Sequence, residues 1–185
     1  LPVFFVLKAV RLPAASLVRC CHNEREFGRV MISQKITVSA IVVTFIYFAG
    51  KFLYRDLWFD EAVTLLNFAL LPDAAAIYRN YAIPNNHILY TILLHYWLML
   101  APAGVEPVFW MRLLSVLLGA ATLLSMYFLF RANLGGRKII TPVLIALGIS
   151  LPFLVYATAI RGYMLSAFLL VWVLYFAKEY SLDQN

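Results

Sequence analysis

Two adjacent acids, Asp60 and Glu61, follow closely after an apolar stretch long enough to cross a bilayer. Charged groups are costly to hold near hydrocarbon, so their presence there suggests a function. A carboxylate at the membrane surface can take a proton from an acceptor hydroxyl, or bind a metal ion, while a lipid-linked substrate stays in the bilayer. We therefore expect chemistry at the interface. The alternative is a solvated helix start, where the helix dipole favours acids.

Two arginines, Arg112 and Arg161, stand near the ends of apolar segments and are candidates for holding an anion. A guanidinium fits phosphate oxygens bidentately, and a fixed cation stabilises the charge that builds on a departing phosphate. The alternatives are a structural pair with Asp60, Glu61 or Glu106, or snorkelling from a helix end.

Asn86 and His87 precede another apolar segment. His87 can hydrogen-bond a phosphate or the acceptor, or it can be a structural histidine at the interface. Asn86 can orient a sugar hydroxyl or cap the next helix. We expect His95, about two turns further on, to be packed or hydrogen-bonded within the bundle.

The composition identifies the class of protein. Hydrophobic residues make up 64% of the 185 residues, charged residues 13%, and the mean hydropathy is +0.85. A soluble domain carries about 25% charged residues. We therefore predict an all-α fold, a polytopic membrane helix bundle of about four spanning helices with amphipathic juxtamembrane helices in its first outer loop. The net charge of +6 indicates topology and attraction to anionic lipid, with no nucleic-acid partner.

Five apolar stretches follow one another, at about 36–54, 87–101, 109–130, 139–158 and 163–177. Six cations precede the first stretch and should hold the amino terminus in the cytoplasm: Lys8, Arg11, Arg19, Arg25, Arg29 and Lys35. The acids then lie outside. We expect 87–101 to lie on or dip into the outer leaflet, because Arg131, Arg137 and Lys138, which follow the apolar stretch 109–130, then fall in the cytoplasm. This topology places Arg112 and Arg161 on the outer side with the acids.

Local signals divide the chain further. Residues 1–35 form a cytoplasmic arm, or an upstream extension before Met31, and residues 36–185 form the transmembrane module, which we expect to be incomplete at its carboxy terminus. Within the outer loop, 60–71 should be an amphipathic surface helix that ends at Pro72, with apolar spacing at Ala62, Leu65, Leu66 and Ala69. We expect Pro142, Gly148 and Pro152 to kink the later span.

Four motifs occur in an order that resembles a known family. They are Trp58–Ala62, Pro84–Tyr90, Met111–Leu114 and Ala159–Tyr163. Their order and spacing look like those of the GT-C glycosyltransferases, with protein O-mannosyltransferases and aminoarabinose-transferase-like enzymes (glycosyltransferase family 39-like) the nearest in pattern. The resemblance covers only the amino-terminal module of such enzymes, approximately 36–177.

The resemblance implies a membrane glycosyltransferase fragment that moves a sugar from a polyprenyl-phosphate donor to a hydroxyl acceptor on a lipid, glycan or protein. It implies a multi-pass protein of the inner (plasma) membrane whose active-site loop faces away from the cytoplasm. Asp60, and second Glu61, would be catalytic. The residues implied in binding the donor phosphate and substrate are Arg161, Arg112, His87, Asn86 and Tyr163.

The chain also departs from the family. It has Pro84-Asn85-Asn86 where aminoarabinose-transferase-like members carry a Glu-Lys-Pro motif whose glutamate binds metal, so the cofactor stays open between none and a divalent metal. A transporter or channel fragment and a non-catalytic membrane subunit are the competing interpretations. Ionisable groups of transporters usually lie near mid-membrane, whereas these lie at predicted span ends, which favours interfacial chemistry.

Overall fold

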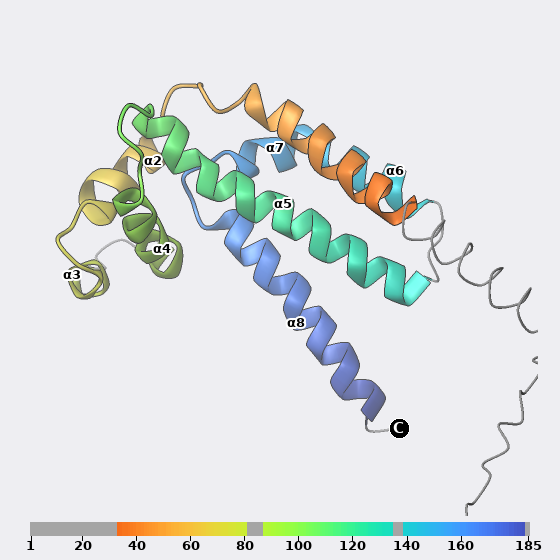
Figure 1. Cartoon of the computed structure of the whole chain (residues 1–185). Helices are drawn as coiled ribbons and strands as arrows, with labels where there is room; N and C mark the ends of the chain where they lie inside the picture. The colour runs from red at the N-terminus through yellow and green to blue at the C-terminus, as the bar shows by residue number, and fades with distance from the viewer. Residues whose placement is uncertain (1–32, 81–86, 135–138, 184–185) are drawn as a thin grey trace, which may run out of the picture. The chain divides into compact units, whose positions relative to one another are not determined.

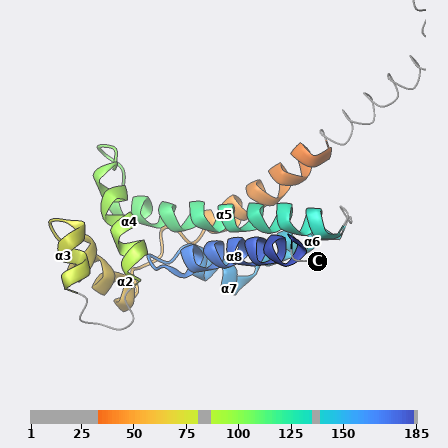
Figure 2. The same cartoon turned by 90° about the horizontal axis from the view of Figure 1, so that it is seen from below.

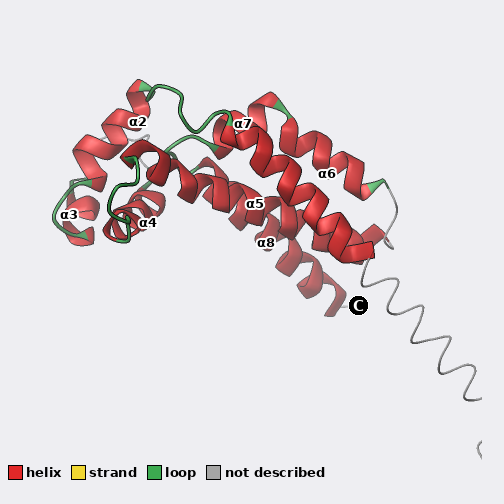
Figure 3. Ribbon diagram, turned by 45° about the horizontal axis from the view of Figure 1, so that its top comes forward, coloured by secondary structure: helices red, strands yellow, loops and turns green. Residues whose placement is uncertain are grey.

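The computed structural model describes residues 33–80, 87–134 and 139–183, and all regular structure within those ranges is helical (Figures 1 and 3). The chain divides into two compact units, 1–37 and Val38–Asn185, and the second unit contains the core and the candidate site residues. The predicted amino-terminal arm lies almost entirely outside the described residues, and so do Asn85 and Asn86.

A helix over Ser33–Gly50 comes first. The later elements are α2 (Phe59–Thr64), the π-helical turn η1 (Leu65–Ala69), α3 (Ala74–Arg79), α4 (Ile88–Met99), α5 (Pro107–Leu134), α6 (Ile140–Ile149), α7 (Leu151–Ala157) and α8 (Tyr163–Asp183). Helices α5 and α8 lie side by side in both views (Figures 1 and 2).

Two of the described helices are long and apolar enough to cross a membrane, namely Ser33–Gly50 and Pro107–Arg131 of α5. Helices α6 and α7 add a third if the bent pair is one span. The apolar part of α8, Tyr163–Lys178, is too short to pass the same test. The helical membrane class is therefore supported, whereas the predicted four spans are not confirmed.

The bend between α6 and α7 is 65° and falls at Ser150. Pro152 lies in the first turn of α7, and a proline there prevents α6 from continuing because its ring would meet the carbonyl four residues earlier. Pro142 lies in the first turn of α6, where no intrahelical N–H donor is needed, so that helix starts undisturbed. The predicted kink is confirmed, and it is a break beside Pro152.

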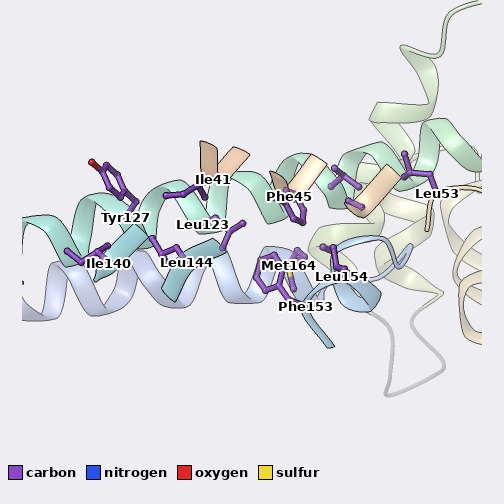
Figure 4. Packing of buried hydrophobic residues seen from close by; sticks show 13 residues of the cluster. Ile41, Phe45, Leu53, Leu123, Tyr127, Ile140, Leu144, Phe153, Leu154 and Met164 are labelled. Carbon is purple, nitrogen blue, oxygen red and sulfur yellow. The ribbon is translucent and has the colours of Figure 1, made fainter. Parts of the chain in front are cut away.

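The main core lies between the first helix and the helices α5 to α8 (Figure 4). Its labelled members are Ile41, Phe45, Leu53, Leu123, Tyr127, Ile140, Leu144, Phe153, Leu154 and Met164. Backbones approach closely at Gly119, where an added Cβ would lie 3.0 Å from Phe45 Cζ and 3.1 Å from Ala157 Cβ. The glycine thus permits the tight packing of α5 on its neighbours.

Helix α4 lies across the starts of two longer helices. Near its amino end, the His87 ring is 5.3 Å from that of Tyr163, which begins α8. Near its carboxy end, Trp97 stacks on Trp110 of α5 at 4.5 Å, and each indole N–H donates to the other residue's carbonyl, at 2.8 and 2.9 Å. Its 12 residues are about 18 Å long. Helix α4 is therefore shorter than the roughly 30 Å hydrocarbon core of a bilayer.

The predicted surface helix over 60–71 differs in register from the observed one. Helix α2 passes into η1, where Leu70 N–H bonds to Leu65 C=O five residues back, and the helical run ends before Pro72. A π-turn inserts one residue and rotates the residues after it about the helix axis. The buried face runs through Glu61, Thr64, Phe68 and Ala69, whereas Leu66, expected on the apolar face, is 66% exposed.

Candidate functional site

Glu61 and Arg112 form an ion pair with no exposure to solvent. The Arg112 Nη2 atom is 3.0 Å from Glu61 Oε2, and both side chains have 0% relative exposure. Arg55, with 18% side-chain exposure, lies 3.6 Å from the other carboxylate oxygen. A buried charge needs such partners, because removal from water is costly for each ion.

Two backbone amides complete the surroundings of Glu61. Ile160 N–H donates to Oε1 at 2.8 Å, and Trp58 N–H donates to Oε2 at 2.9 Å. The second bond is half of a capping box, in which the third residue of a helix bonds back to the residue before the helix. Both carboxylate oxygens are thus occupied in this arrangement.

Arg112 also holds the chain that comes after the first helix. Its guanidinium donates to the carbonyls of Leu53 at 2.9 Å, Asp56 at 3.0 Å and Arg55. These carbonyls lie outside regular helices and need donors when they are buried. Arg112 therefore fixes the segment that leads to the acids.

Asp60 and Arg161 form a second, more open pair. Arg161 Nη1 is 3.7 Å from Asp60 Oδ2 and 3.3 Å from Asp60 C=O. The Asp60 side chain is 57% exposed and that of Arg161 is 5% exposed. The structure thus brings into contact two residues that are 101 positions apart in the chain.

The ring of Tyr163, itself in contact with two other rings, lies near Arg161. The Arg161 guanidinium carbon is 5.8 Å from the centre of the Tyr163 ring, and Tyr163 lies 4.8 Å from Tyr156. His87 packs directly on Gly162, because a Cβ added there would lie 2.6 Å from His87 Cβ. The structure thus brings His87 and Tyr163 to the Asp60–Arg161 pair, while Asn86 lies outside the described residues.

His87 has an unusual environment for a histidine. Its Nε2 atom is buried and has no hydrogen-bond partner among the described residues. Burial, and then the positive charge of Arg161, lower the pKa of His87 below its ordinary value near 6.5. The imidazole is therefore neutral at neutral pH, with one ring nitrogen able to donate a hydrogen bond and the other able to accept one.

Sequence reasoning missed Arg55 and Tyr156. Arg55 lies over the Trp58 ring at 4.2 Å and donates to Val155 C=O at 3.3 Å, in addition to its contact with Glu61. The available signal was a third cation six residues before Glu61. Tyr156 carried no signal, because only the folded chain places it against Tyr163.

A divalent metal does not fit these residues. Among the described residues, no three His, Cys, Asp or Glu side chains gather into a group able to bind a metal ion. Of the two acids, Glu61 is enclosed by four donors and Asp60 faces a guanidinium. Glu61 and Asp60 are therefore not part of such a group among the described residues.

The open pair combines a solvent-accessible carboxylate, a guanidinium and a neutral imidazole within one group of contacts. This set can take up a proton and hold an anion. Comparisons of the chain with protein-family models, curated proteins and solved structures gave no match.

Proposed function

We propose that this chain is the amino-terminal module of a GT-C-type membrane glycosyltransferase. The observation that carries the proposal is the contact between Asp60 and Arg161, at 3.7 Å, at the end of the helix bundle where the first helix leaves it and α8 begins. A carboxylate and a cation at a span end suit a reaction between a lipid-linked donor and a polar acceptor.

In the proposed reaction, the Asp60 carboxylate takes the proton of an acceptor hydroxyl. The hydroxyl oxygen attacks the anomeric carbon of the donor sugar, and the bond from that carbon to the phosphate oxygen breaks. Polyprenyl phosphate leaves with the electron pair, and the Arg161 guanidinium stabilises its charge. Attack opposite the leaving group inverts the anomeric centre.

The proposal includes a topology of four crossings. Ser33–Gly50 would lead outward, α5 inward, the bent pair α6 and α7 outward, and α8 inward, with α4 held in the outer leaflet. Support comes from α4, whose two ends contact the starts of α8 and α5. With about 18 Å of helix against about 30 Å of hydrocarbon, α4 is too short to cross.

The decisive experiment is the substitution Asp60→Asn in the protein reconstituted into vesicles. The assay measures release of polyprenyl phosphate from polyprenyl-phosphate mannose or aminoarabinose in the presence of envelope acceptors. We expect release to fall by about 10²-fold or more, with membrane insertion unchanged. Asp73→Asn is the matched control, because Asp73 is an exposed helix cap that asparagine replaces well. Full turnover by Asp60→Asn would contradict the proposal.

The topology has its own test. Single cysteines replace Phe59 and Asn133, which are both exposed, and sealed right-side-out vesicles are treated with a membrane-impermeant maleimide. We expect labelling at position 59 before permeabilisation and at position 133 only after it. The reverse pattern would contradict the topology, and transport of a solute by the reconstituted protein would favour the transporter interpretation.

A further inference from the structure

We infer that Glu61, Arg112 and Ser115 are positioning residues, which hold Asp60 and Arg161 in register without contacting substrate. This inference rests on the proposed function. It reassigns Glu61 and Arg112, for which the family resemblance implied direct roles in catalysis and donor binding.

The first step is adjacency along the chain. Asp60 precedes Glu61, and Arg161 follows Ile160. The Ile160 N–H donates to Glu61 Oε1 at 2.8 Å, so one hydrogen bond joins the neighbours of both proposed site residues. Any displacement of Glu61 must therefore change the separation of Asp60 from Arg161.

The second step is a matching hydrogen bond on the other side of the same segment. Ser115 Oγ donates to Ala159 C=O at 2.6 Å, and Tyr90 Oη lies 2.7 Å from Ser115 Oγ. Since the serine proton is used on Ala159, the tyrosine must be the donor to serine. The peptide group between Ala159 and Ile160 is thus held from both ends.

The third step is the face of α5 from which both anchors come. Arg112 and Ser115 are three residues apart, so they lie on one side of the helix. Arg112 holds the segment 53–61 through three carbonyls and Glu61, while Ser115 holds the segment that contains Arg161. One rigid helix therefore aligns both halves of the site.

Burial excludes direct contact with substrate in this arrangement. Glu61, Arg112 and Ser115 each have 0% exposure, and the Glu61 oxygens are occupied by four donors. Neither a lipid-linked phosphate nor an acceptor hydroxyl reaches them, whereas Asp60 stays open.

The experiment compares Arg112→Lys and Ser115→Ala with matched controls on the same helix. Arg131→Lys changes an arginine that donates to the Tyr127 hydroxyl, and Ser125→Ala changes a partly exposed serine. Two quantities are measured on the reconstituted protein: the kcat and KM for the lipid-linked donor, and backbone hydrogen exchange. Lysine cannot reproduce the forked geometry of arginine, so both site variants should loosen the site.

We expect the site variants to lower kcat by about tenfold or more and to change KM by less than about threefold, because a misplaced pair lowers transition-state stabilisation. Exchange over 53–61 and 158–162 should rise by about tenfold, with the rest of α5 and both controls unchanged. Full kcat, a large rise in KM alone, or lower kcat without faster local exchange would each overturn the inference.

The two measurements, of kinetics and of hydrogen exchange, distinguish failure of the inference from failure of the proposed function. If the wild-type protein transfers no sugar, the proposed function fails, and local exchange alone decides whether these residues hold the segments. If Arg112→Lys does not fold, Ser115→Ala supplies both measurements, because it removes one hydroxyl and leaves the ion pair in place.

Discussion

The two acid–arginine pairs of this protein begin from neighbouring residues and end in opposite environments. Glu61 and Arg112 are both fully enclosed, whereas Asp60 is mostly exposed beside Arg161. The difference arises because successive residues of a helix point about 100° apart, so Glu61 turns toward α5 while Asp60 turns away. A single helical turn thus carries one carboxylate that stabilises the fold and one that stays accessible.

The comparison also shows that a charged residue near a membrane has two distinct uses. The enclosed pair satisfies backbone groups of two segments, 53–58 and the turn at Ile160, and so links the segment before α2, α5 and the turn before α8. In the open pair, Arg161 contacts the Asp60 carbonyl and carboxylate, and the Asp60 side chain stays 57% exposed. Changes to the enclosed pair should therefore alter stability and the alignment of the site, whereas replacing Asp60 should alter chemistry.

The largest expected effect is that of Glu61→Ala. The substitution leaves Arg112 charged and enclosed without its carboxylate, which should destabilise the protein by about 3–5 kcal/mol. Chemical denaturation of the protein in detergent measures this. Asp60→Ala is the control, and it should change the free energy of unfolding by less than about 1 kcal/mol because the pair is exposed on one side. Equal effects of the two substitutions would remove the distinction between the pairs.

A smaller effect is expected from Gly162→Ala, which disturbs the open pair alone. The new Cβ would lie 2.6 Å from His87 Cβ and 2.7 Å from His87 Cγ, so the start of α4 must move away from Arg161. We expect a loss of about 1–3 kcal/mol and slower transfer. Gly50→Ala is the control, since no atom lies within 4 Å of its added Cβ. A stable, fully active Gly162→Ala variant would show that His87 need not lie where it does.

The smallest effect concerns pH. The folded protein holds His87 neutral, so the unfolded chain binds more protons at this residue in the range just below about pH 6.5. The contribution of His87 to the free energy of unfolding is therefore fully present above that pH and is lost as the pH falls. The midpoint of unfolding by chemical denaturant is measured at about pH 5.5 and at about pH 7.5. The difference between the two midpoints should be smaller for His87→Gln than for the wild type. An identical difference would exclude His87 as the source.

The helices could be predicted because they depend on local composition. Apolar stretches located the first helix, α5 and α8, and a proline located the break at Ser150. The end of the first helix could not be predicted. The apolar run suggests an end near residue 54, whereas the helix ends at Gly50 and the segment beyond it is held by Arg112, 59 residues after Leu53. Hydrogen bonds between residues so far apart in the chain do not affect the local pattern of apolar residues from which helices are predicted.

The site was predictable in part. The predicted topology placed Asp60 and Arg161 on the same side of the membrane, and pairs of either arginine with Asp60 or Glu61 stood among the structural alternatives; both arginines form such pairs. The sequence could not predict which of the two acids is buried. Both lie in the first turn of a helix, where the helix dipole and the expected exposure to solvent are the same for each. The face of α2 and η1 that is buried, which includes Phe68 and leaves Leu66 exposed, could not be predicted either, because η1 packs against α4, a contact between segments distant in sequence.

The stacked indoles of Trp97 and Trp110 are 4.5 Å apart with planes 7° from parallel. Chromophores this close share their excited states, so they should give a coupled band in ultraviolet circular dichroism. The band would vanish when α4 leaves α5. The circular dichroism of this tryptophan pair would therefore report whether α4 stays packed on α5, without any label or substrate.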